Sequence, residues 1–174
     1  MRIHRLVPAA VLVALALSAT AALAEGVPVQ LSLFSPVQLV PEKNSVSGVR
    51  LDLIYGKNVN VQGIDLGLVN HTTGNELGLQ YGVLGLVEKD FTGWQDNFIN
   101  ITNGEFTGFQ YGLFNQAGSA NGLELGFVNV TQHMHGVQVG ILNMTQTLHG
   151  LQIGVGNVIQ KGKTPFLPIV NWSM

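Results

Sequence analysis

The sequence predicts an all-β protein built from about ten short strands, one for each repeat of 14 or 15 residues. Three observations support this prediction. A phrase headed by glycine recurs at a nearly constant spacing from Gly48 onward, apolar residues alternate with small or polar ones inside each phrase, and a polar segment rich in turn-forming residues follows it. Self-similarity at a fixed short period is typical of proteins that stack one small structural unit.

Each phrase reads as a strand followed by a turn. Counting the heading glycine as position zero, positions one, three and five are apolar, as in Val137, Val139 and Ile141. Strict alternation of this kind predicts a β-strand with one apolar face and one small polar face. The clearest copies are GIDLGLVN at 63–70, GFQYGLFN at 108–115, GLELGFVN at 122–129, GVQVGILN at 136–143 and GLQIGVGN at 150–157.

A second apolar position lies two residues before the heading glycine, and we expect it to anchor the return segment in the core. With this anchor and the aliphatic face packed inside, one repeat would bury about five apolar side chains, each contributing roughly 1.5–3 kcal/mol. Ordering costs about 1.5 kcal/mol per residue, so a single repeat cannot fold without its neighbours. The anchor residues are Val46, Val61, Phe91, Phe106, Met134 and Leu148.

Residues 1–24 are predicted to be a cleaved secretory signal peptide. Arg2 and Arg5 give a basic start, residues 6–22 form an apolar run, and Ala22-Leu23-Ala24 has the small-x-small pattern of a cleavage site. The protein is therefore expected to be exported, to the periplasm, the outer membrane or the cell surface.

Residues 25–174 are predicted to form a single all-β repeat domain. A first edge segment at 28–35 and a last edge segment at 164–174 flank the core repeats at 48–163, and the last segment keeps the 14-residue step from Gly150. Both are expected to be modified repeats that end the array, since proline cannot donate to a strand ladder and belongs at a sheet edge.

Composition excludes several classes of protein. The chain has no cysteine and thus no disulfide, and its charged residues are only 10% of the total, against about 25% in ordinary soluble domains. From residue 25 onward, six Lys or Arg stand against ten Asp or Glu, which argues against a nucleic-acid partner. The surface is expected to be uncharged polar or lipid-facing.

The favoured architecture is a β-solenoid, in which each repeat makes one coil and coils pair in parallel about 4.8 Å apart. It explains why one strand, rather than a hairpin, is the repeating unit. Identical residues would then stack, so we expect the Gln positions to form one column and the closing asparagines to form an amide ladder: Asn70, Asn100, Asn115, Asn129, Asn143 and Asn157.

The alternative is a ten-stranded outer-membrane β-barrel with its aliphatic face toward lipid. Low charge, an even strand count and the apolar alternation of Val170, Trp172 and Met174 fit such a barrel. However, only three outward apolar positions per strand are secure, whereas a spanning strand needs about 9–11 residues. Whether the aliphatic face packs inside a solenoid or faces lipid is left open at this point.

Several phrases resemble those of a family of bacterial exported proteins, the surface repeat-containing proteins with GLQLGLVN-type repeats. The resemblance rests on the repeats and on two end motifs, PVQLSLFSPVQLVPE at 28–42 and PFLPIVNWS at 165–173. It implies a location in the envelope or at the cell surface. The family has no established function, so the resemblance implies no catalytic residue.

The candidate sites are few. His133 and His135 form an H-x-H pair, and His149 repeats the place of His135, which makes these three weak candidates for a zinc site. Asp65 and Glu124 replace Gln in the repeat, but four coils would separate them by roughly 19 Å, too far for an acid–base pair. We therefore predict no catalytic residue, no cofactor and no resident metal.

The copy headed by Gly93 departs most from the rule, because Asp96 stands at an apolar position and Asn97 replaces the second glycine. An exposed Trp94 beside these two residues is a candidate recognition site for a sugar or a partner.

The sequence thus predicts a non-catalytic structural or interaction protein of the bacterial cell envelope that presents an extended repeat face to a partner. That partner is an unidentified envelope protein or polysaccharide, another copy of the chain, or the outer membrane. The alternative function is a small outer-membrane barrel that acts as a pore or anchor.

Overall fold

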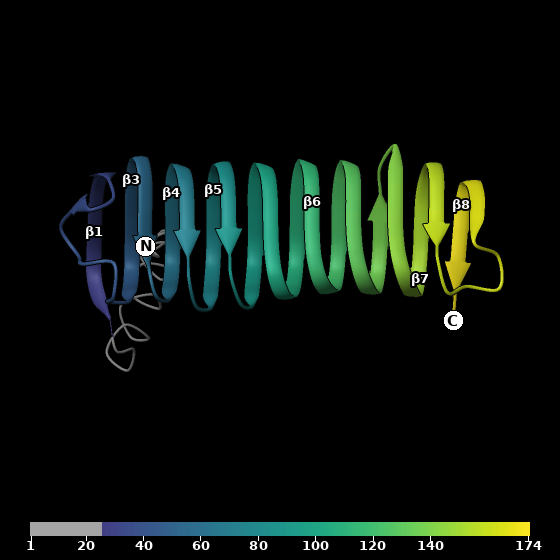
Figure 1. Cartoon of the computed structure of the whole chain (residues 1–174), viewed down its shortest axis with the longest axis horizontal. Coiled ribbons are helices and arrows are strands. Elements are labelled where there is room, and N and C mark those ends of the chain that lie inside the picture. The colour runs from purple at the N-terminus through teal and green to yellow at the C-terminus, as the bar shows by residue number, and fades with distance from the viewer. Residues whose placement is uncertain (1–25) are drawn as a thin grey trace, which may run out of the picture.

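The computed structural model describes residues 26–174, so the predicted signal peptide at 1–24 lies outside the described residues. Figure 1 shows a row of coils stacked along one axis, with the two chain ends of the array at opposite ends of the row. The strands are β1 (Val27–Phe34), β2 (Val37–Gln38), β3 (Val46–Asn58), β4 (Val61–Thr72), β5 (Glu76–Val87), β6 (Phe91–Val139), β7 (Leu142–Ile159) and β8 (Phe166–Ser173).

Neighbouring coils pair in parallel and in register. Gly48 pairs with Gly63, Gly63 with Gly78, and Gly78 with Gly93, and β6 continues through several further coils as one strand of 49 residues. Successive strands of an up-and-down barrel would instead run antiparallel. The structure is therefore a β-solenoid, which confirms the favoured architecture.

The heading glycines form one column along the solenoid, and no other residue fits there. All eight have φ between 125° and 152°, a region that L side chains rarely adopt. A Cβ atom at Gly108 would also lie 2.1 Å from the carbonyl oxygen of Gly93 in the preceding coil. The glycine column thus allows each coil to lie against the backbone of the preceding coil at these positions.

The aliphatic face points outward, which answers the question that the sequence left open: this face does not pack inside the solenoid. Leu53 and Leu68 at position five are 66% and 51% exposed, whereas Gln80 and Gln95 at position two have no exposed surface. Burial of amides is costly only when they lack hydrogen-bond partners. Identical stacked coils supply those partners, because each interior amide lies beside its own copy.

The closing asparagines form a continuous hydrogen-bonded ladder from Asn100 to Asn157. Each Nδ2 atom donates to the Oδ1 atom of the asparagine in the next coil, over 2.7–2.8 Å. The same Nδ2 atoms also donate to a backbone carbonyl of the next coil, such as that of Leu125 for Asn115. Asn70 is buried too, but it lies outside the continuous ladder, since Gly85 takes the asparagine place in the following coil.

The residues at position two form a second column, called the glutamine column here. In this column each Nε2 donates to the preceding coil, as from Gln152 to Gln138 at 2.8 Å and from Gln110 to Gln95 at 2.7 Å. The two amide columns therefore run in opposite directions, and their dipoles oppose each other along the solenoid axis.

The glycine at position four leaves room for the asparagine ladder. A Cβ atom at Gly126 would lie 2.7 Å from Nδ2 of Asn115 and 2.8 Å from Oδ1 of Asn129. Each fixed position of the phrase G-x-Q-x-G-x-x-N thus has a structural explanation. The first glycine leaves room for the backbone of the preceding coil, and the second leaves room for the asparagine ladder. The Gln and Asn amides form hydrogen bonds along the solenoid axis.

The other part of the interior is apolar. The predicted anchors two residues before each heading glycine are all buried, which confirms their inward direction. Phe91 and Phe106 stack with ring centroids 5.7 Å apart and planes inclined by 15°. The solenoid core therefore has an amide side and an apolar side.

The two end segments differ in strand direction. β1 pairs in parallel with β3, and the two-residue strand β2 pairs antiparallel with β1 beyond it. At the other end, β8 runs antiparallel to β7, so residues 164–174 do not continue the coils as a modified repeat. The chain turns back at residues 160–165, where Ile159 N donates to Pro165 O at 2.9 Å, so it reverses without completing a coil.

Candidate functional site

The most extended feature of the exterior is an apolar outer face, formed by positions one, three and five of the coils headed by Gly48 to Gly150. Position five alone is 40–72% exposed in every coil. Monomeric proteins rarely leave so long an apolar row uncovered. The residues at position five are Leu53, Leu68, Val83, Phe98, Leu113, Phe127, Ile141 and Val155.

The apolar outer face is convex. Positions five and six both point outward, which breaks the alternation of a straight strand and marks a corner of the coil. Apolar residues continue beyond this corner, for example Leu84, Ile99 and Val128 at position six. Eight coils about 4.8 Å apart make the face about 38 Å long, and the eight residues around the corner make it about 23 Å wide.

The opposite side of the coils is polar. Its exposed residues include Glu88, Lys89 and Asp90 in one coil and Gln132 and His133 in another. The solenoid exterior is therefore amphipathic around its circumference, with the corner at position five in the middle of the apolar part.

The predicted recognition residues lie on opposite faces of the same strand, two outside the solenoid and one inside it. Trp94 is 49% exposed and Asp96 is partly exposed on the apolar outer face, whereas Asn97 is 2% exposed and lies inside. The inclusion of Asn97 in a recognition site was therefore wrong. Its Nδ2 atom donates to Gln80 Oε1 at 2.9 Å and to Asn100 Oδ1 at 2.7 Å, so its amide belongs to the core.

Asn97 compensates for a missing ladder residue. The coil headed by Gly78 has Gly85 where others have asparagine, and a Cβ atom at Gly85 would lie 2.4 Å from Nδ2 of Asn97 and 2.0 Å from Oε1 of Gln80. The side chain of Asn97 thus occupies the space that the ladder asparagine leaves empty. Asn97 at a glycine position and Gly85 at an asparagine position therefore compensate for each other, as if the two residue types had been exchanged between neighbouring coils.

Asp96 borders a groove of about 410 Å³ on the apolar outer face. Tyr81 and Tyr111 lie on either side of it in the neighbouring coils, and Phe98 lines the same groove. Trp94 packs edge-on against Phe109, with centroids 5.4 Å apart and planes inclined by 81°. Partial burial among these residues raises the pKa of Asp96.

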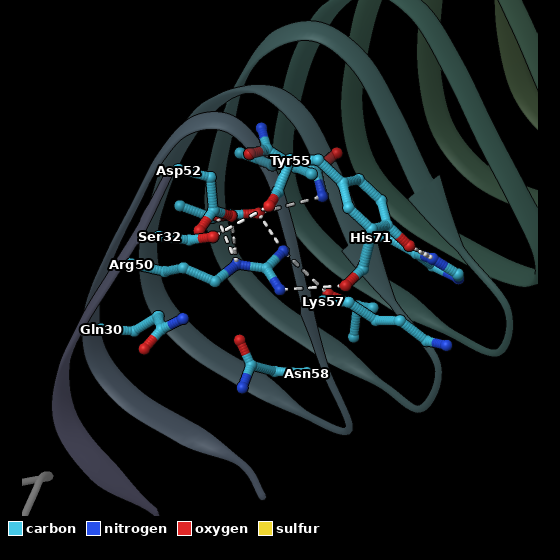
Figure 2. A network of polar contacts seen from close by, with 12 residues as sticks. Gln30, Ser32, Arg50, Asp52, Tyr55, Lys57, Asn58 and His71 are labelled. Atoms are coloured by element: carbon cyan, nitrogen blue, oxygen red, sulfur yellow. Dashed lines mark hydrogen bonds and ion pairs between the residues drawn. The ribbon is translucent and has the colours of Figure 1, made fainter. Parts of the chain in front are cut away.

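A buried ionic cluster ends the glutamine column near the N-terminal end of the array, and the sequence analysis did not find it. Arg50 Nε and Nη2 donate to the two carboxylate oxygens of Asp65 at 2.7 and 2.6 Å. Figure 2 shows the guanidinium of Arg50 inside the coils, among polar side chains and a backbone carbonyl, that of His71. The sequence did contain a signal for this cluster, because Arg50 and Asp65 stand at the Gln position of successive repeats, where oppositely charged side chains would stack.

Two further carboxyl groups lie in this cluster. Arg50 Nε is 3.2 Å from Asp52 Oδ2, an ion pair without hydrogen-bond geometry, because that N–H is directed at Asp65. Burial raises the pKa of Asp52 to about 7 and raises the pKa of Glu76 well above its ordinary value. The Cβ position of Gly56 lies within 2.0 Å of the Asp52 carboxyl, so this side chain fills another vacant asparagine place.

Asp65 and Glu124, the two carboxylates of the glutamine column, have separate partners. Asp65 binds Arg50, whereas Glu124 accepts hydrogen bonds from Thr131 Oγ1 and Gln138 Nε2, both at 2.6 Å. Burial raises the pKa of Glu124. The structure does not bring the two together.

The histidine candidates lie on the polar side. His135 and His149 pair in register with ring centroids 5.4 Å apart, and His133 Nδ1 lies 2.9 Å from Thr147 Oγ1. Within residues 26–174, no group of three or more His, Cys, Asp or Glu side chains is arranged to hold a metal ion.

No helix in the part of the chain that the structure describes is long and apolar enough to cross a membrane. The chain matches no protein-family model, and neither a curated protein nor a solved structure is significantly similar to it. The resemblance to the surface repeat-containing proteins stays a prediction.

Proposed function

We propose that this protein is a non-catalytic interaction protein of the bacterial cell envelope that binds a lipid surface with its apolar outer face. The observation that carries the proposal is the continuous apolar exterior, about 38 Å long at about 4.8 Å per coil, opposite a polar side. An interaction role fits the core, whose buried Gln and Asn side chains bond to one another along the solenoid.

The shape of the apolar outer face favours lipid over a rigid partner. The face bends around the corner at position five, and a flat protein surface would cover only one side of that corner. Fluid acyl chains adapt to a convex surface, as they do around amphipathic helices that insert about 5–10 Å into the interface. A polysaccharide fits this surface poorly, since positions one, three and five offer one charged side chain, Asp96.

Two expectations from the sequence agree with this proposal. A cleaved signal peptide would deliver the chain to the envelope, and the resemblance to exported surface repeat proteins implies the same location. The role of membrane anchor, considered above for a barrel, is retained here for a solenoid that lies along the membrane surface.

The test is flotation of the purified chain with vesicles of a neutral glycolipid, which carry neither net charge nor an ammonium group. We expect the chain to float with the vesicles. The double variant Leu68→Lys/Val155→Lys changes two exposed residues of the apolar outer face, and we expect the bound fraction to fall at least fivefold.

The matched control is Gln132→Lys/Gln160→Lys, which adds the same charge to exposed positions of the polar side. This variant should float as the parent does. The proposal fails if the parent chain stays at the bottom of the gradient. It also fails if light scattering shows a discrete dimer whose formation the Leu68→Lys/Val155→Lys change abolishes, because the face would then be covered by a second copy.

A further inference from the structure

We propose that the groove around Asp96 on the apolar outer face is a binding site for an organic ammonium group, a primary or quaternary amine on a ligand. This inference does not depend on the proposed function, because a soluble ammonium compound tests it without any lipid.

The first argument is the placement of the side chains. Tyr81 pairs in register with Asp96, and a Cβ atom at Gly112 would lie 2.4 Å from Asn97 O, which places Tyr111 over Asp96 in the next coil. Two coil spacings of about 4.8 Å separate the two tyrosine strands, so the shorter Asp96 side chain leaves a gap of about 10 Å between them. The groove of about 410 Å³ occupies this gap.

The second argument is the concentration of aromatic rings around the carboxylate. On the apolar outer face most coils carry aliphatic residues, and the aromatic ones gather at Asp96. Four aromatic residues line the groove beside Asp96: Tyr81, Phe98, Tyr111 and Phe127. Trp94 lies two residues before Asp96 on the same strand and packs against Phe109. Aromatic faces attract organic cations through their quadrupole, and cages of such rings recognise quaternary ammonium groups.

The third argument is the unmatched charge of Asp96. It is the single residue with a charged side chain at positions one, three and five of the coils, and no salt bridge among residues 26–174 includes it. The pKa of this carboxyl is raised by desolvation alone, without any compensating positive side chain. A cationic ligand would supply the missing charge in an environment that the rings keep partly dry.

Other ligand classes fit less well. A divalent metal ion such as Ca²⁺ takes six to eight oxygen ligands, and Asp96 supplies one carboxylate. A sugar needs several convergent polar groups, but the neighbouring amide of Asn97 is directed into the core. One carboxylate between aromatic rings is the arrangement that an ammonium group requires.

The experiment measures binding of tetramethylammonium and choline to the purified chain, with 3,3-dimethylbutanol as the uncharged analogue of choline. Trp94 fluorescence reports binding in a Trp172→Phe background, which removes the chain's other tryptophan. We expect saturable binding of both cations and at least tenfold weaker binding of the uncharged analogue.

Two variants separate charge from shape. Asp96→Asn removes the charge, and Asp96→Leu installs the residue type that position three carries in several other coils, so it preserves the fold. Both should weaken cation binding at least tenfold, whereas Glu105→Gln, on the polar side, should not change it. Equal binding of the uncharged analogue, or unchanged cation binding by both Asp96 variants, overturns the proposal.

A last comparison identifies the source of the ammonium group. If the site binds a lipid headgroup, soluble glycerophosphocholine should compete with tetramethylammonium and soluble glycerophosphoglycerol should not. If neither headgroup competes while both soluble cations bind, the ligand is a soluble amine or a basic side chain, and the ammonium site stands.

Discussion

Gln110 and Glu124 occupy successive coils of the glutamine column, and the Oε1 atom of Gln110 has no hydrogen-bond partner where the column would place a donor. For Gln80, Gln95 and Gln138 an Nε2 atom of the next coil fills that place, as Gln110 itself does for Gln95. A carboxylate has no N–H to give. Only the protonated form of Glu124 can donate to Gln110, which agrees with the raised pKa of this buried group.

Glu124→Gln is expected to complete the column and stabilise the protein. Because the folded-state pKa of Glu124 is raised, the folded chain holds this proton more tightly than the unfolded one, so the parent loses stability as pH rises above about 4.5. The variant should gain about 1–3 kcal/mol at pH 8 and less at pH 4. Urea unfolding across this pH range measures the effect.

The control for this prediction is Glu105→Gln, which changes an exposed glutamate on the polar side. It should leave the pH profile of the parent unchanged. Parallel profiles for the parent and Glu124→Gln would show that Glu124 is not protonated in the folded state.

Gly85 and Asn97 are expected to be coupled. Gly85→Asn alone would collide with Asn97, and Asn97→Gly alone would remove two buried hydrogen bonds, so each should cost about 2–3 kcal/mol. The double variant restores the common phrase in both coils and should recover at least 1 kcal/mol relative to the sum of the two losses. A double-mutant cycle in urea unfolding measures this coupling free energy. Strictly additive losses would contradict the compensation between Gly85 and Asn97.

The glycine column should be the part of the repeat least tolerant of substitution. Gly108→Ala places a methyl group 2.1 Å from a backbone oxygen at a φ of 131°, and we expect a loss of more than about 3 kcal/mol. Gly156→Ala meets only the ends of side chains, at 3.2 and 3.7 Å, and serves as the matched control with a change below about 1 kcal/mol. Thermal unfolding of the two variants tests the contrast.

Arg50→Met is expected to destabilise the N-terminal coils by about 3–5 kcal/mol at pH 8, because it leaves buried carboxylates without their cation. Burial already raises the pKa of Asp52 to about 7, so stability falls as pH rises from about 4 toward 7. The loss should therefore be smaller at pH 5, where the raised pKa values of Asp52 and Glu76 keep these two carboxyl groups protonated. Lys57→Met removes a half-exposed cation 3.5 Å from Glu42 and should have little effect.

If the Arg50→Met loss were the same at pH 5 and pH 8, the carboxyl groups around Arg50 would not change their protonation between these two pH values, and the prediction would be wrong. Hydrogen exchange of the amides in β3 and β4 would locate the change, since the cluster joins these two strands.

The solenoid and its amide ladder were predictable because they depend on spacing. Identical residues 14 or 15 positions apart stack whenever the coils run in parallel, and the asparagines from Asn100 to Asn157 do so. The reversal of β8 was not predictable from spacing, since residues 164–174 keep the repeat step while the turn at residues 160–165 changes the strand direction. The role of Asn97 needed the structure as well, because its partner Gly85 lies in another coil.

By itself, the sequence determined the unit, its period and the difference between the two faces of each strand. Only the tertiary structure decided which face is inside. Hydrophobicity favours an aliphatic interior, but parallel stacking places every Gln and Asn beside its own copy, so their amides are satisfied without water. That removes the usual penalty for a polar core and leaves the aliphatic face outside, where its binding partners must be sought.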